Sequence, residues 1–304
     1  MGHGHGHGGP ASQRHRGRLA VVFALVAAFF VVELVYGLLA SSLALLSDAG
    51  HMAADVVTLG AALAATRIAT RIDRTGRRTF GSYRAEVFAS GFAVLVMLGV
   101  SVYVVVEAVS RIGSQVDVQT GPMIVVGVLG LLVNVVSLVL LNAGAGESLV
   151  VRGAYLEVVA DAAGSVGVVV AGVLVATTGS TWWDTVVALA IGVFVAVRAV
   201  VLARQVLAVL GQHVPDGMDV DAVVADLRAV EGVDDVHDLH VWVLTSGMNV
   251  ATAHLVAAGA STGPAALDRV LADARTVLRE RHHVEHATLQ VEGCRAPECH
   301  SVDW

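Results

Sequence analysis

The sequence predicts an α-helical membrane protein with six transmembrane helices, followed by a small cytoplasmic α+β domain. Of the 304 residues, 56% are hydrophobic and only 15% are charged, whereas about a quarter of an average soluble domain is charged. Six apolar stretches are long enough to cross a bilayer. The charge then changes along the chain: residues 1–212 hold 13 Arg and 11 acidic residues, and residues 213–304 hold 6 Arg and 15 acidic residues.

Each transmembrane helix is predicted from an apolar run, because a helix needs about 20 residues to cross the hydrocarbon core. The runs lie at residues 19–39, 43–65, 87–110, 123–141, 149–176 and 183–202. Only residues 40–42 separate the first two runs, which predicts a tight helical hairpin. The first run is too long for a signal peptide and five more follow it, so we expect it to be a transmembrane helix.

The placement of arginine predicts the orientation of these helices. Twelve of the 13 arginines in residues 1–212, including Arg152, Arg198 and Arg204, fall near helix ends on one side of the membrane, and only Arg111 falls near the other. Cytoplasmic loops carry an excess of positive residues. Both chain ends are therefore predicted to be cytoplasmic, and the compactness of the chain favours a bacterial-like plasma membrane.

Two less apolar segments flank the membrane domain, which is predicted to span residues 19–212. Residues 1–18 are rich in Gly and His, and we predict a disordered cytoplasmic segment that could loosely collect metal, unless the histidines are an expression tag. Residues 213–304 show helical periodicity or β-rich runs in the order α-β-β-α-β, which predicts a small α+β layer. These elements are expected at residues 219–230, 236–244, 249–256, 264–281 and 286–291.

Composition also excludes several classes of protein. The net charge is −7, and the chain offers no basic surface, so nucleic-acid binding is excluded. A disulfide scaffold needs many cysteines, and this chain has two, Cys294 and Cys299. No H-E-x-x-H sequence of a zinc protease occurs, so we expect no enzyme and no organic cofactor.

The residues that point to function are ionisable groups inside the apolar runs, where burial is costly and a charge marks a pathway or a site. His51 and Asp55 are four residues apart in the second run, and Glu157 and Asp161 repeat this spacing in the fifth. Residues at i and i+4 share one helix face. One imidazole and three carboxylates suit a divalent metal, zinc first. The alternative is that these groups only hydrogen-bond the helices together.

Other polar residues in the runs are weaker candidates, and we do not expect any of them to bind metal. Glu86 and Glu107 lie near helix ends, where water can reach them. Glu33 and Asn134 could join helices by hydrogen bonds.

A second metal site is predicted in the cytoplasmic domain, which is rich in histidine. Residues an even number of positions apart on a strand share a face, and this selects His286 with Glu292, and one of His237 and His240. The candidate ligands are His237, His254, His286, Glu292, Cys294 and Cys299. The alternative is a set of surface histidines that do not converge.

Four motifs resemble the cation diffusion facilitator family over residues 19–292. They are SLALLSDAGH at 42–51, TFGSYRAE at 79–86, YLE at 155–157 continuing to DAAGS at 161–165, and VHDLHVW at 236–242. The resemblance implies six transmembrane helices, a cytoplasmic ferredoxin-like domain, a homodimer, and efflux of zinc or a similar ion in exchange for protons.

Carried over by motif, the transport site of this family falls on His51, Asp55, Glu157 and Asp161. Zinc-transporting members commonly have His where this chain has Glu157. A carboxylate accepts more kinds of metal than imidazole does, so cobalt, cadmium, iron and manganese are possible cargo beside zinc. A membrane receptor or sensor that binds metal without moving it is the alternative function, and net flux separates the two.

Overall fold

The computed structural model describes residues 10–68, 79–112, 116–145, 149–245, 247–257 and 263–293. The chain divides into two compact units, Met1–Arg204 and Gln205–Trp304, which are described in turn. Of the segment predicted to be disordered at residues 1–18, residues 10–18 instead form the first part of helix α1, Pro10–Leu39. Residues 1–9 and the cysteines Cys294 and Cys299 lie outside the described residues.

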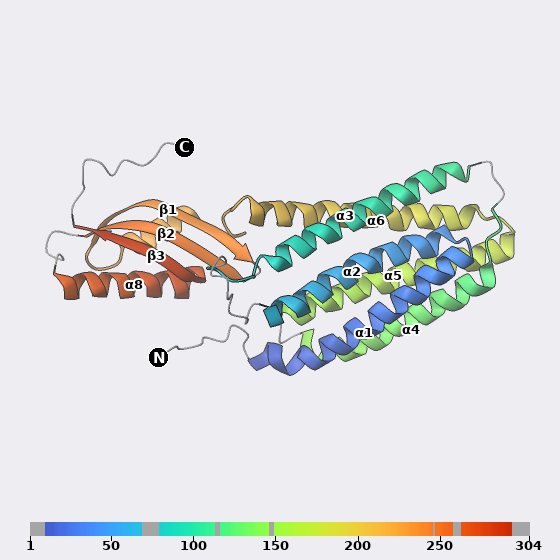
Figure 1. Ribbon diagram of the computed structural model, residues 1–304, viewed down its shortest axis with the longest axis horizontal. Coiled ribbons are helices and arrows are strands. Elements are labelled where there is room, and N and C mark those ends of the chain that lie inside the picture. The colour runs from blue at the N-terminus through green and yellow to red at the C-terminus, as the bar shows by residue number, and fades with distance from the viewer. Residues whose placement is uncertain are drawn as a thin grey trace. The chain divides into compact units, whose positions relative to one another are not determined.

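Six long helices make up the first unit (Figure 1). Their bounds are α1 Pro10–Leu39, α2 Leu43–Ile68, α3 Ala85–Ser110, α4 Thr120–Ala145, α5 Leu149–Thr178 and α6 Trp182–Leu210. Each of the six predicted apolar runs lies inside one of these helices. The tight hairpin between α1 and α2 is also present, with Ser41 at a positive φ of 51° in the turn.

The helices expose large apolar side chains on their outer faces and bury several polar side chains within an otherwise apolar core. Large apolar side chains such as Leu95, Val102 and Val139 are more than 60% exposed. The buried polar residues include Glu33, Asp48, His51, Asp55, Asn134 and Asp161. Within the described residues, α1, α3, α4, α5 and α6 are long and apolar enough to span a membrane. Helix α2 is 26 residues long and carries three of the buried ionisable groups, which lowers its mean hydropathy.

Glycines let α2 approach its neighbours closely. A Cβ at Gly164 of α5 would lie 2.3 Å from Asp48 Oδ1, and a Cβ at Gly50 of α2 would lie 2.2 Å from Val100 Cγ1. Real side chains do not approach this closely, so glycine is required at both positions for this packing. The small residues around the two predicted ligand pairs therefore bring α2 against α5 and α3.

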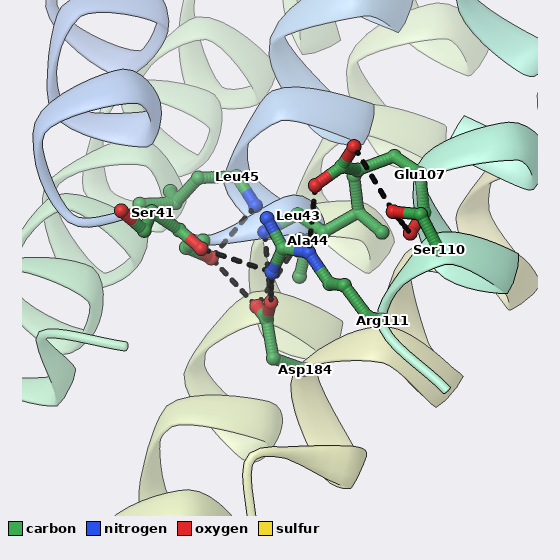
Figure 2. A network of polar contacts seen from close by, with 9 residues as sticks. Ser41, Leu43, Ala44, Leu45, Glu107, Ser110, Arg111 and Asp184 are labelled. Atoms are coloured by element: carbon green, nitrogen blue, oxygen red, sulfur yellow. Dashed lines mark hydrogen bonds and ion pairs between the residues drawn. The ribbon is translucent and has the colours of Figure 1, made fainter. Parts of the chain in front are cut away.

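The N-terminus of α2 is capped by a residue of another helix (Figure 2). Asp184, at the start of α6, is fully buried and accepts hydrogen bonds from Ser42 Oγ at 2.7 Å, the Leu43 amide at 2.7 Å and the Ala44 amide at 3.1 Å. Arg111, the residue that follows α3, donates to the same carboxylate at 3.4 Å. The first amides of a helix have no partner within it and attract negative charge. Asp184 thereby joins the starts of α2 and α6 to the end of α3.

The second unit is an α+β layer with the order α-β-β-α-β, as the sequence predicts. Its elements are α7 Val220–Arg228, β1 Val233–Thr245, β2 Met248–Ala257, α8 Pro264–His282 and β3 Val284–Glu292. The sheet has the order β1-β2-β3, with β1 and β2 antiparallel and β2 and β3 parallel. Figure 1 shows α8 running along this sheet.

One face of the sheet packs against the two helices. Leu227 of α7 and Leu278 of α8 share a core with Ala253 and Leu255 of β2. Because side chains alternate along a strand, His254 between these two residues lies on the opposite face. The two helices therefore pack on the face of the sheet opposite His254.

Candidate metal centre

Three of the four residues predicted in the membrane domain converge between α2 and α5. His51 Nε2 lies 3.7 Å from Asp55 Oδ2 and 3.4 Å from Asp161 Oδ1. One candidate ligand atom from each residue lies within 4.8 Å of the other two, and all three side chains are buried. Ligands about 2.1 Å from a tetrahedral zinc ion are about 3.4 Å apart. The spacing of these atoms therefore suits a metal ion of that size.

Helix geometry explains the convergence. His51 and Asp55 are one turn apart on one face of α2, and Asp161 faces them from α5. The close contact between Asp48 and Gly164, one turn before His51 and one turn after Asp161, holds the two helices at this separation.

Three polar atoms of the site have no hydrogen-bond partner of their own among the described residues. Asp55 Oδ2, Asp161 Oδ1 and His51 Nδ1 are buried without a hydrogen-bond partner in the described part of the chain. Buried polar atoms are nearly always paired, and buried carboxylates are paired or bind metal. Two carboxylate oxygens and one imidazole nitrogen are also a donor set that zinc and neighbouring divalent metals accept.

The fourth predicted ligand, Glu157, is held by a different partner. Its carboxylate forms an ion pair with Nη2 of Arg198 from α6, and its side chain is 39% exposed. Arg198 Nη1 also lies 2.9 Å from His51 Nε2. The structure thus brings His51, Asp55 and Asp161 together and places Arg198 between this cluster and Glu157.

A second cluster lies in the second unit, on the face of the sheet opposite its two helices. His237 of β1 pairs directly with His254 of β2. Glu292 of β3 contacts both: its carboxylate lies 3.2 Å from His237 Nε2 and 2.9 Å from His254 Nδ1. The candidate ligand atoms of the three residues lie within 4.8 Å of one another. Three of the six residues predicted for this site therefore converge.

Two other histidines of the sheet lie apart from this cluster. His286 pairs with Val250, whereas Glu292 pairs with Val256, six residues further along the sheet. Six residues of strand span about 20 Å, so sharing a face with Glu292 does not bring His286 to the same ion. His240 lies 3.6 Å from Asp238 Oδ1. The positive φ of 55° at Asp238 and an irregular register separate it from His237.

Sequence reasoning missed Arg198 as a site residue. The arginine distribution uses Arg198 only to orient the helices, although this residue lies inside the predicted run 183–202. A charge inside an apolar run was the available signal. The role of Asp184 is also not evident from the sequence, because it stands at the edge of the same run and the groups at the start of α2 that it binds are about 140 residues away.

Both units match known protein domains. Residues 19–210 match the cation efflux transmembrane domain. Residues 215–294 match the cation efflux protein, cytoplasmic domain.

Three relatives match almost the whole chain. The metal cation efflux system protein CzcD of Cupriavidus metallidurans is 40% identical over 274 residues, which cover 90% of this chain and 85% of that protein. The zinc transporter ZitB of Escherichia coli is 33% identical, over 93% of this chain and 90% of that protein. The cadmium, cobalt and zinc/H(+)-K(+) antiporter of Bacillus subtilis is 30% identical, over 94% and 90%.

Among solved structures, the metal-bound C-terminal domain of the CzcD transporter of C. metallidurans is similar to part of this chain. It is 33% identical, covers 25% of this chain and 99% of that domain, and gives a TM-score of 0.23.

Proposed function

The chain belongs to the cation efflux family, the cation diffusion facilitators, and we propose that it exports zinc from the cytoplasm in exchange for protons. It is an integral membrane protein and a transporter of divalent metal cations, not an enzyme. Cobalt, cadmium, iron and manganese are further candidate cargo, because the proposed ligands include carboxylates that accept many metals.

One observation carries the proposal: His51, Asp55 and Asp161 are buried together between two helices of a membrane domain. Such groups are costly in a membrane interior and mark an ion pathway. The spacing of their ligand atoms fits a zinc ion, and the site draws on α2 and α5. Small movements between these two helices would therefore change the metal affinity directly.

The mechanism follows from competition between metal and protons for the same atoms. Metal ligands must be deprotonated to bind, so a metal ion that enters the site displaces protons. When the helices move and open the site to the other side of the membrane, protons compete for the carboxylates and the metal leaves. Such a cycle couples export of a cation to entry of protons without any covalent chemistry.

The proposed orientation places both chain ends in the cytoplasm, in agreement with the arginine distribution. The sheet cluster of His237, His254 and Glu292 is then a cytoplasmic metal site. We propose that the protein is a homodimer, as the resemblance implies, and that metal at this second site favours the state that accepts cargo. A regulatory ion has this effect only if its affinity differs between the two states.

Metal accumulation in a zinc-sensitive bacterial host tests the export function. Cells that produce the wild-type protein should retain less zinc than cells with an empty vector, because the protein removes the ion from the cytoplasm. Cells that produce Asp161→Asn at the same membrane level should retain as much zinc as the vector control.

The sensor alternative gives a different pattern. If the purified wild-type protein binds zinc but does not lower zinc accumulation in cells, then export is excluded and the receptor function is favoured.

A further inference from the structure

Arg198 places a positive charge at the proposed transport site. Its Nη1 atom lies 2.9 Å from His51 Nε2, and its Nη2 atom forms an ion pair with Glu157. Its guanidinium carbon lies 5.9 Å from the centre of the Phe194 ring, which itself packs edge-on against His51 at 5.9 Å. The guanidinium is therefore held by α2, α5 and α6 together, and its side chain is only 24% exposed.

The contact with His51 uses the nitrogen that would bind a metal ion. A guanidinium group has only donors and does not lose its proton in proteins, so Nε2 of His51 is the acceptor. Nε2 is also the atom that faces Asp55 and Asp161. A ring nitrogen has a single lone pair in the ring plane, which either accepts a hydrogen bond or coordinates a metal. Arg198 and a metal ion therefore exclude each other at this atom.

The contact with Glu157 has a related consequence. Glu157 shares a face of α5 with Asp161, one turn away, yet its carboxylate is engaged by Arg198. If the guanidinium moves away, two groups become available at once to bind a metal ion: the Nε2 atom of His51 and the carboxylate of Glu157.

We propose that Arg198 is a tethered cation that occupies the transport site when metal is absent and that the cargo ion must displace it. The inference rests on the proposed transport function. In the metal-free protein the guanidinium offsets part of the charge of three carboxylates, those of Asp55, Glu157 and Asp161. Its return after transport competes with the metal for His51. Arg198 thus weakens metal binding, and this favours release of the ion.

A purely structural role predicts the opposite sign. If Arg198 only held α6 against α2 and α5, its removal would loosen the site and weaken metal binding. If Arg198 competes with the metal, its removal tightens binding. The direction of the change in affinity separates the two roles.

The test is a titration of the full-length protein in detergent with zinc, at fixed pH and in a His254→Ala background that removes the cytoplasmic cluster. The signal of the membrane site is the binding lost in Asp161→Asn. We expect Arg198→Gln to tighten this binding by about tenfold or more, as loss of a competing charge-assisted hydrogen bond implies. Arg204→Gln, an exposed arginine six residues further along α6, is the matched control and should bind as the parent does.

Arg198→Lys provides a second variant in case the neutral one does not fold. Lysine keeps the positive charge but lacks the planar guanidinium, whose two terminal nitrogens reach His51 and Glu157 together. Zinc binding should therefore be tighter than in the parent. Binding that is unchanged or weaker in the folded Arg198 variants would overturn the proposal, as would equal tightening in Arg204→Gln. Absence of any Asp161-dependent zinc binding would overturn the transport site itself, and this inference with it.

Discussion

At the scale of single residues, the geometry of the proposed transport site depends on how closely α2 approaches α5. Asp48 and Gly164 meet one turn from the three buried residues proposed as ligands, and no room exists there for a larger side chain. A site whose ligands come from two helices has the correct geometry only if those helices keep their separation. The residues that set the separation are therefore as important as the ligands.

Gly164→Ala tests this point. The added Cβ would lie 2.3 Å from Asp48 Oδ1, and overpacking of this kind costs about 1–3 kcal/mol. We expect a lower unfolding temperature in detergent and weaker zinc binding at the membrane site. Gly99→Ala on α3 is the control, since nothing lies within 4 Å of its added Cβ; its effect should stay within about 1 kcal/mol. Equal behaviour of the two variants would contradict the packing argument.

The sequence predicts which side chains share a face of a helix, because the helix period alone determines this. The spacing of His51 and Asp55 places them on one face of α2 whatever the rest of the chain does. The same spacing and the family motif predict Glu157 as a metal ligand. Its partner Arg198, however, comes from another helix, 41 residues later in the sequence. Helix period carries no information about which neighbouring helix supplies a competing cation, so Arg198 could not be found in this way.

At the scale of elements, α2 is fixed at its N-terminus by α6. The carboxylate of Asp184 accepts hydrogen bonds from two backbone amides and from the Ser42 hydroxyl, and Arg111, just after the end of α3, forms an ion pair with it. This contact fixes the end of the helix that carries His51 and Asp55. We infer that relative movement of α2 and α6 takes place away from this end.

Asp184→Ala should therefore destabilise the membrane domain strongly. It leaves the amides of Leu43 and Ala44 without this acceptor and removes one of the two carboxylate partners of Arg111, and breaking a buried charged pair costs about 3–5 kcal/mol. Thermal unfolding in detergent measures the effect. Glu107→Gln, which alters the more exposed side of the same network, should cost about 1 kcal/mol or less. A loss for Asp184→Ala no larger than for Glu107→Gln would contradict the capping role.

Element prediction was accurate in type and order in both units, because apolar run length and period decide whether a segment is a helix or a strand. The ends of the strands were less accurate. Strand β1 begins at Val233 rather than at residue 236, because Val233 pairs with Ala257 of β2. Such pairing between strands extends an element beyond its apolar core, and it depends on contacts that a local pattern does not contain.

At the scale of the whole molecule, two units carry two proposed metal sites with different environments. The membrane cluster is buried, whereas the cluster of His237, His254 and Glu292 is partly exposed on a sheet face. A site that binds cargo must release it during each cycle. A partly exposed site outside the membrane has no such requirement, so it is suited to a regulatory ion.

Removal of the chain after Leu210 tests the coupling between the units. The membrane unit keeps its own core and the three buried residues proposed as ligands, so transport should continue at a lower rate or from a less stable dimer. The measurements are the initial rate of zinc uptake into proteoliposomes and the dimer fraction by light scattering. Rate and dimer fraction both equal to those of the full chain would rule out a coupled cytoplasmic domain.

His254→Ala tests the proposed metal ion at the sheet without removing the domain that would hold it. Loss of one ligand from three should remove the second zinc ion while the membrane site is retained, so equilibrium dialysis should find less zinc per protomer than in the wild type. Thr252→Ala, on the same strand and face, is the control and should leave the zinc content unchanged. An unchanged zinc content in His254→Ala would exclude this cluster as a metal site.

The most direct test of the central claim is zinc flux into proteoliposomes under an imposed pH gradient, with wild type and Asp161→Asn reconstituted at equal density. We predict zinc movement that follows the gradient, reverses when the gradient is reversed and is absent in Asp161→Asn, with cobalt, cadmium and manganese competing in order of their affinity for the site. Zinc binding by the wild type with no flux under either gradient would contradict zinc/proton exchange.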